Sequence, residues 1–227
     1  MLRDLAKKAF LRALFLLPHN SVYEYHHVTD RPKVELSACK MNTQAFYDFV
    51  LSHGPYVSSG ELLQRERFDS HAAITFDDGL EDLYTIAYPF LKQHGIPFTA
   101  FLLPEKIGKE GYITREQMLQ MAADPLVTLA SHGIEHERHG QMEEQRQRAS
   151  IMDSRIKLEK MLDKPCKYFA YPFGSYNKAT LKIMESAGYE RAFAVKGRPL
   201  FPWNVKAAYT VPRLSIHDGT VDYYRTS

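Results

Sequence analysis

Two adjacent carboxylates, Asp77 and Asp78, follow the apolar, strand-like residues 72–76 and precede Gly79. Neighbouring side chains of a strand point to opposite faces, but beyond the strand end both carboxylates can turn toward one cavity, and the glycine permits the sharp bend. Two close acids repel each other unless a cation lies between them or one takes a proton. The pair is therefore a candidate metal or acid–base site, although an Asp in this place can also cap a helix.

Two histidines, His132 and His136, follow a second apolar stretch at residues 126–130. On a helical turn, side chains four residues apart share one face, so both imidazoles can reach one ion. With an Asp oxygen from the neighbouring strand end they make a set of two histidines and one carboxylate. Such a set leaves positions open for water and substrate, as a catalytic metal requires.

The same histidines also match a different pattern, because Glu135 turns them into the H-x-x-E-H motif of inverted zinc peptidases. That motif lies within a helix and uses the glutamate as general base. Here the histidines directly follow a predicted strand, and Gly133 weakens a helix interior. The peptidase hypothesis also leaves the two aspartates without a role, so we keep it only as an alternative.

Strand-like and helix-like segments alternate along the whole chain, without an internal repeat, a low-complexity linker or a break in composition. Such alternation predicts an α/β fold of parallel β-α-β units in a single domain, residues 1–227. Polar clusters follow several strands, and in α/β barrels the chemistry lies at the carboxyl ends of the strands. The predicted strands are residues 22–25, 72–76, 98–103, 126–130, 168–171, 192–195 and 209–216. The predicted helices are residues 43–53, 59–67, 81–94, 114–123, 142–163 and 177–187, with Thr43 and Asn177 as caps and a capping box at residues 114–117.

The composition of the 227-residue chain excludes several classes of protein. An apolar content of 44% is ample for a core, and a formal charge of +2 without a block of basic residues gives no sign of nucleic-acid binding. No apolar run is long enough to span a membrane. Cys39 and Cys166 match no zinc or redox spacing, and we expect both to be reduced.

Residues 1–18 combine an apolar stripe at helical spacing with basic residues on the remaining faces. This pattern predicts an amphipathic N-terminal helix. Such a helix either covers an apolar patch of its own domain, which we favour, or lies on an anionic membrane surface. Because we find no export signal, we predict a cytoplasmic protein, with peripheral contact at the inner membrane face as the alternative.

Three ordered motifs resemble those of the polysaccharide deacetylase family, the NodB-homology or carbohydrate esterase family 4 group. They are T-F-D-D-G at residues 75–79, S-H-x-x-x-H at 131–136 and F-A-Y-P-F-G at 169–174. The resemblance covers about residues 20–217. It implies a distorted (β/α) barrel of about seven strands, removal of N-acetyl groups from amino sugars of a polysaccharide or glycan precursor, and one divalent ion. That ion is expected to be Zn²⁺, with Co²⁺ or Ni²⁺ as substitutes.

Carried over to this sequence, the resemblance assigns a role to five residues. Asp77 would be the general base, and the backbone N–H of Phe173 would help to bind the oxyanion. Asp78, His132 and His136 would bind the metal.

The acid histidine has two candidates. The stretch Y-H-H-V at residues 25–28 resembles the equivalent motif of a circularly permuted branch that includes biofilm poly-N-acetylglucosamine deacetylases. In that branch the histidine directly after the tyrosine is the acid, so we favour His26 and expect His27 to lie outside the site. His217 competes, because it could mimic the C-terminal motif of unpermuted members.

The sequence departs from the family pattern in two places. The third motif usually carries an Arg where Ala170 stands, and that Arg normally pairs with the base; Arg213 is our candidate replacement, with a purely structural salt bridge as the alternative. The fourth motif is not clear, and Trp203 is either its remnant or a core aromatic. The further candidates for substrate binding or tuning are Tyr171, Arg213, Trp203 and His217.

A catalytically inactive, carbohydrate-binding member of the same fold is the second class of function. We favour an enzyme, because each core role has a candidate residue of the right type. The expected partner is an N-acetylated glycan rather than nucleic acid, with peripheral contact to a membrane or a lipid-linked glycan as the alternative. The oligomeric state is left open.

Overall fold

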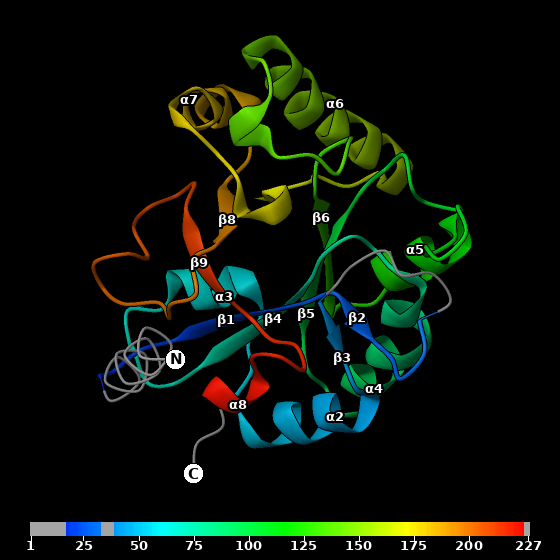
Figure 1. Ribbon diagram of the computed structural model, residues 1–227, viewed down its shortest axis with the longest axis vertical. Helices are drawn as coiled ribbons and strands as arrows, with labels where there is room; N and C mark the ends of the chain where they lie inside the picture. The colour runs from blue at the N-terminus through cyan, green and yellow to red at the C-terminus, as the bar shows by residue number, and fades with distance from the viewer. Residues whose placement is uncertain (1–16, 33–38, 225–227) are drawn as a thin grey trace.

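Seven parallel strands close into a barrel in the computed structural model, which describes residues 17–32 and 39–224 (Figure 1). Every neighbouring pair is parallel, so all carboxyl ends meet at one rim. The predicted distorted (β/α) barrel of about seven strands is confirmed. In barrel order the strands are β1 (Ser21–Tyr25), β4 (Ala72–Phe76), β5 (Phe98–Leu102), β6 (Val127–Ser131), β7 (Tyr168–Ala170), β8 (Arg191–Val195) and β9 (Val211–Ser215).

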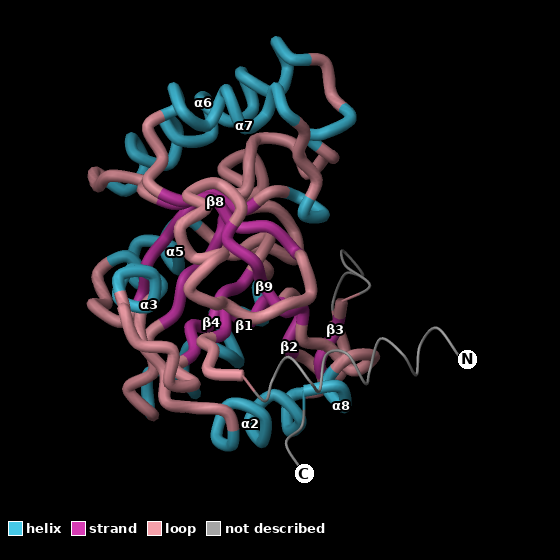
Figure 2. Tube along the Cα trace, turned by 90° about the vertical axis from the view of Figure 1, so that its left-hand side faces the viewer, coloured by secondary structure: helices cyan, strands magenta, loops and turns pink. Residues whose placement is uncertain are grey.

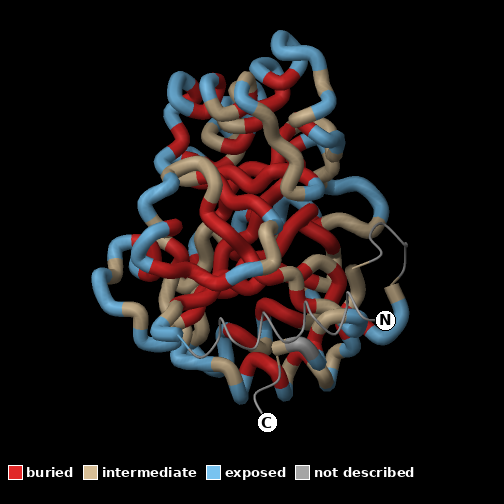
Figure 3. The backbone as a smooth tube through the Cα atoms, turned by 60° about the vertical axis from the view of Figure 1, so that its left-hand side comes forward, coloured by how far each residue is buried: buried red, intermediate tan, exposed pale blue. Residues whose placement is uncertain are grey.

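The barrel strands are apolar on both faces because one face fills the interior and the other lies under helices. The alternation is visible in β1 and β4, where Val22 and Ala73 belong to one buried cluster while Tyr23 and Ile74 belong to another. Figure 3 shows the strands as a buried centre and the outward faces of the surrounding helices as exposed. The predicted strands therefore lie where the sequence places them, with ends that differ by one or two residues.

Helices surround the barrel and connect its strands (Figure 2). The long pair α6 and α7 covers one side, and α2 lies at the opposite end of the view in Figure 1. The helical elements are α2 (Thr43–Ser52), α3 (Ser59–Gln64), η1 (Leu83–Ala87), α4 (Tyr88–Gln93), α5 (Arg115–Ala122), η2 (His139–Gln141), α6 (Glu144–Leu162), η3 (Pro172–Gly174), α7 (Lys178–Ala187) and α8 (Val221–Tyr224).

Local capping signals explain most of the helix starts. The predicted capping box of Thr114 and Gln117 opens α5, and Asn177 caps α7. At α2 the cap is Asn42, whose side chain accepts from the N–H of Ala45, and not Thr43 as predicted. The single helix expected over residues 81–94 is divided by the π-helical turn η1, and the helix expected to reach Arg67 ends at residue 64.

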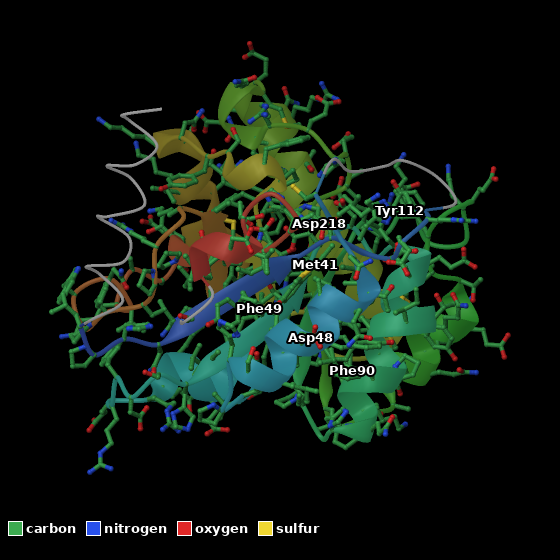
Figure 4. The ribbon with its side chains drawn as sticks, turned by 60° about the horizontal axis from the view of Figure 1, so that its bottom comes forward. Met41, Asp48, Phe49, Phe90, Tyr112 and Asp218 are labelled. Atoms are coloured by element: carbon green, nitrogen blue, oxygen red, sulfur yellow. The ribbon has the colours of Figure 1, made fainter. Side chains whose placement is uncertain are left out.

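A small second sheet lies beside the rim, formed by β2 (His27–Val28) and β3 (Lys40–Met41). The loop after β9 is bonded to it, because the N–H of Asp218 donates to the carbonyl of Lys40 at 3.0 Å. Figure 4 labels Asp218 next to Met41.

Some sequence expectations fall outside the described residues. The amphipathic helix predicted over 1–18 is one of them, since the description starts at residue 17. In the part of the chain that the structure describes, Cys39 and Cys166 form no disulfide, and no helix has the length and apolarity to cross a bilayer.

Replacing Gly174 by Ala is expected to destabilise the protein more than replacing Gly197 by Ala. Their φ angles are +62° and +60°, so either alanine adopts the left-handed region at a cost of about 1–2 kcal/mol. A Cβ at Gly174 would also lie 2.8 Å from the backbone nitrogen of Val195, whereas one at Gly197 meets no atom within 4 Å. Equilibrium urea unfolding measures both losses, and equal values would contradict this packing.

Candidate active site

The two carboxylates at the end of β4 are buried and directed by an unusual backbone turn. The N–H of Asp77 donates to the carbonyl of Tyr25 at 2.9 Å, which extends the ladder with β1 by one residue. Asp78 and Gly79 then both take left-handed conformations with φ of 72°. Position 79 needs glycine for a second reason, because a Cβ there would lie 2.8 Å from the side chain of Leu102.

Asp78, His132 and His136 lie together at the carboxyl ends of β4 and β6. One ligand atom from each residue lies within 4.8 Å of the others. The Oδ1 of Asp78 is 3.5 Å from Nε2 of His132 and 3.3 Å from Nε2 of His136. The structure thus brings together the three residues that the sequence names as metal ligands.

The histidine pair is presented by a loop, and our assumption of a helical turn was wrong. His132 directly follows β6, where its N–H donates to the carbonyl of Leu102 at 2.8 Å, and residues 132–138 form no helix. The loop is braced by Ser150 of α6, whose hydroxyl accepts the N–H of Ile134 at 3.1 Å. The H-x-x-E-H peptidase alternative requires a helix here, and the loop argues against it.

The unpartnered atoms of this group fit a bound cation. Nδ1 of His132 lies 2.8 Å from the carbonyl of Ala170, to which it can only donate, so Nε2 is left with a lone pair. Burial lowers the pKa of His132 to about 3, which keeps the ring neutral. Nε2 of His132 and Oδ1 of Asp78 are both buried without a hydrogen-bond partner, although they face each other. Two facing acceptors are unfavourable unless a proton or a metal ion lies between them, and the set of two imidazoles and one carboxylate suits a metal ion.

The carboxylate of Asp77 is held by Arg213, which comes from β9 on the far side of β1. Two guanidinium nitrogens donate to the two carboxylate oxygens, each at 2.6 Å, and both side chains are buried. Burial alone would raise the pKa of Asp77, but Arg213 and then His132 hold it well below the usual value. Arg213 thus occupies the place expected of the family arginine that Ala170 replaces.

Glu24 is a member of the site that sequence reasoning missed. It lies on β1 between β4 and β9, and its carboxyl oxygen is 3.4 Å from Nδ1 of His26. Burial raises the pKa of Glu24 to about 7, against the lowering influence of Arg213. Ligand atoms of Glu24, His26 and Asp77 lie within 4.8 Å of one another. An acidic residue in the middle of an apolar strand was the signal that could have identified it.

The three histidines near β1 separate into two groups. His26 lies beside Asp77, and His217 lies close enough for His26 to lower its pKa, after the larger effect of burial. The side chain of His27 is bonded to a different residue, since its Nδ1 lies 2.5 Å from a carboxylate oxygen of Asp82. The N–H of Ile216 donates to the carbonyl of Glu24 at 2.9 Å, so the chain carries both candidates for the acid along neighbouring strand ends, whereas His27 is bonded to Asp82.

The loop after β7 brings the backbone of Phe173 to the rim. Phe173 adopts φ 58° and ψ 16°, a left-handed conformation that is rare for a bulky residue. Its half-exposed ring lies with its centroid 4.5 Å from that of His136 and under the guanidinium of Arg138 at 4.4 Å. These contacts hold an uncommon backbone conformation next to a candidate metal ligand.

The side chains of two further candidates, Tyr171 and Trp203, lie away from this rim. The Tyr171 side chain is fully buried and its hydroxyl donates to the carbonyl of Tyr209 at 3.1 Å. Trp203 is 67% exposed, but its loop has returned to the amino ends of the strands, because Leu200 forms a bridge with Asn20 just before β1. We therefore withdraw Tyr171 and Trp203 as substrate contacts of this site.

The family model for polysaccharide deacetylases matches residues 64–192, more than half of the 227-residue chain. Poly-beta-1,6-N-acetyl-D-glucosamine N-deacetylase of Staphylococcus aureus is 28% identical over 165 residues, covering 66% of this chain and 56% of the relative. YxkH of Bacillus subtilis is 38% identical over 117 residues, covering 52% of this chain and 42% of the relative. The chain thus spans about half the length of the curated relatives it matches.

Solved structures share the fold over most of the chain. IcaB from Ammonifex degensii superimposes with a TM-score of 0.77 at 23% identity, covering 91% of this chain and 95% of that one. The deacetylase PplD of Streptococcus pyogenes, solved in complex with acetate, gives 0.73 at 22% identity and covers 88% and 92%. At identities of 22% and 23%, these structural similarities establish the barrel fold alone.

Replacing Arg213 by Met is expected to cost about 3–5 kcal/mol of unfolding free energy, because Asp77 is left as an uncompensated buried charge. The double variant with Asp77→Asn should lose less than the sum of the single variants, since neither charge then remains. Urea unfolding of the chelated protein measures this cycle. Arg65→Met removes a partly exposed arginine paired with Glu61 and should cost only about 0–1 kcal/mol. Additive losses at Asp77 and Arg213 would show that the pair is not coupled.

Proposed function

The chain belongs to the polysaccharide deacetylase family, and from that premise we propose that it is a metal-dependent hydrolase that removes N-acetyl groups from the amino sugars of a glycan. The observation that carries this proposal is the pair of facing, unpartnered acceptors on Asp78 and His132 next to the ionised Asp77. The name of the Staphylococcus aureus relative supports N-acetylglucosamine as the sugar, and the acetate bound to PplD supports acetyl as the acyl group.

Asp78, His132 and His136 would hold one divalent ion. Two imidazoles and one carboxylate suit zinc, for which Co²⁺ or Ni²⁺ would substitute. When bound, the ion supplies Lewis acidity, which lowers the pKa of a water molecule and polarises the acyl carbonyl.

Asp77 acts as the general base in this proposal. Arg213 keeps it ionised at neutral pH and fixes both of its oxygens, so a lone pair is held ready for the proton of the attacking water. Proton transfer to a positioned base of this kind typically contributes about 10²–10⁴-fold to the rate.

His26 acts as the acid that gives a proton to the departing amine. The carbon–oxygen bond to water forms and the carbon–nitrogen bond of the amide breaks, which yields a free amino sugar and acetate. A carboxyl oxygen of Glu24 lies 3.4 Å from Nδ1 of His26 and would pair with the imidazole in its protonated form. His217 stays the alternative acid, because its chain neighbour Ile216 is hydrogen-bonded to Glu24, two residues before His26.

The backbone N–H of Phe173 donates to the oxyanion that develops on the acyl group. A hydrogen-bond donor placed for a developing oxyanion is worth about 3–4 kcal/mol of barrier. The left-handed conformation of Phe173, supported by Gly174 behind it, directs this group.

Acetate release from N-acetylglucosamine oligomers tests the proposal. We expect release to stop with a chelator and to return with Zn²⁺ or Co²⁺, because Asp78, His132 and His136 supply three metal ligands at the site. Elemental analysis before and after chelation is the control. A protein that binds metal at this site but releases acetate from no N-acetylated glycan would contradict deacetylation, and one that binds carbohydrate without metal would be the inactive member considered from the sequence.

Replacing Asp77 and replacing Asp78 are expected to impair the protein in different ways. Asp77→Asn should lower kcat by about 10²–10⁴-fold while zinc stays bound, because only the base is removed. Asp78→Asn should lose zinc, because a ligand is removed. Zinc content and acetate release are measured together, with Asp153→Asn on the exposed side of α6 as the control. Full activity of Asp77→Asn would overturn its assignment as base.

A further inference from the structure

Three cations stand on the loops that follow β5, β6 and β8, and each lies over an aromatic ring. The Nζ of Lys106 is 5.8 Å from the ring centre of Tyr112, and that of Lys196 is 5.3 Å from Tyr176. The guanidinium of Arg138 is 4.4 Å from the ring centre of Phe173. We call Lys106, Arg138 and Lys196 the rim cations.

Two of the rings under the rim cations lie near residues of the candidate metal group. Tyr112 forms a backbone bridge with Leu80, two residues after Asp78, and Figure 4 labels it. The ring of Phe173 lies beside His136.

Lys196 reaches the same rim from the far side. Its chain neighbour Val195 packs closely on Gly174, because a Cβ added to Gly174 would lie 2.8 Å from the backbone nitrogen of Val195. Lys196 itself directly follows the last residue of β8. The three cations therefore stand on loops at the carboxyl ends of β5, β6 and β8, about half of the barrel mouth.

The rim cations lack an ion pair with a carboxylate, unlike the other described cations that lie over aromatic rings. Lys92, Arg155 and Arg213 also lie over rings, and each is bonded to a carboxylate, at 2.8, 3.0 and 2.6 Å respectively. Within residues 17–32 and 39–224, no carboxylate lies within ion-pair distance of a rim cation.

Two acidic residues on the same loops form ion pairs with other cations. Glu137 lies next to Arg138 in sequence but is bonded to Arg146 at 2.6 Å, and Glu105 beside Lys106 is bonded to Lys157. Glu110 and Glu135, also on these loops, form no ion pair with a rim cation among the described residues, and Oε2 of Glu135 is buried without a hydrogen-bond partner. The acids next to Lys106 and Arg138 in sequence therefore do not neutralise these two cations.

We propose that the natural substrate is an anionic glycan, in which an N-acetylated sugar carries a phosphate or carboxylate group bound by Lys106, Arg138 and Lys196. This inference rests on the proposed deacetylase function. Lysine and arginine bind both kinds of anion through charge-assisted hydrogen bonds. The rings hold the cations in place, which reduces the side-chain entropy lost on binding.

The test compares three substrates that share one sugar chain. One is the neutral N-acetylglucosamine trimer, one carries a phosphate ester at C6 next to the reacting sugar, and one ends in the carboxylate made by oxidising the reducing end. Wild-type protein loaded with zinc should deacetylate at least one charged trimer with kcat/KM about tenfold above that of the neutral trimer. The advantage should shrink as salt rises from 50 to 500 mM, as screening requires. The better of the two anions identifies the group recognised.

Variants assign the effect to the rim. Lys106→Gln, Arg138→Gln and Lys196→Gln should each lower the ratio of charged to neutral kcat/KM by about threefold or more, and the triple variant should bring the ratio close to one. Lys92→Gln removes a stacked cation away from the mouth and should leave the ratio unchanged. Urea unfolding of each variant checks that the fold is retained.

Binding to the Asp77→Asn protein separates this inference from the function on which it rests. Calorimetry should give a charged trimer a Kd about tenfold lower than the neutral one, whether or not wild-type protein turns it over. Tighter binding of a charged trimer without acetate release would support the anionic ligand and overturn deacetylation. Acetate release with equal kcat/KM and equal Kd for all three trimers would overturn the anionic substrate and leave deacetylation standing.

Discussion

The buried ion pair of Asp77 and Arg213 is the interaction on which the candidate site depends. A carboxylate inside a barrel is stable only if its lost hydration is replaced, and two guanidinium nitrogens at 2.6 Å supply that replacement. The same guanidinium donates to Thr75, whose hydroxyl in turn donates to the carbonyl of Tyr23. Strands β9, β4 and β1 are thereby joined by polar contacts beneath the rim, and the position of Asp77 relative to the metal group is set by the barrel itself.

Features that depend on a few adjacent residues could be predicted from the sequence. The strands were found because residues apolar on both faces mark a covered parallel sheet, and the capping box of Thr114 was found because it requires only four residues. The histidine pair and the aspartate pair were found for a similar reason, since each directly follows a strand and all strand ends of a parallel barrel meet, whereas the choice of Asp78 as the ligand came from the family resemblance. The alignment of these ends was therefore implied as soon as the alternation of strands and helices was recognised.

Features that depend on contacts across the barrel could not be predicted in the same way. His136 reaches Asp78 from an irregular loop, and although Gly133 disfavoured a helix there, no local pattern sets the course of that loop. Glu24 was overlooked because its importance arises only when β1 lies between β4 and β9. Trp203 was misplaced because its loop runs back along the barrel to Asn20, a course set by tertiary packing rather than by composition.

The separation of Asp77 and Arg213 by 136 positions has a consequence for how the protein is made. On the ribosome β4 is synthesised long before β9, and contacts of such large sequence separation form late and slowly. Until β9 pairs with β1 and β8, the Asp77 carboxylate lacks the guanidinium that replaces its water of hydration. The ion pair of the proposed base can therefore form only when the barrel closes, and the candidate site is completed in the same step as the fold.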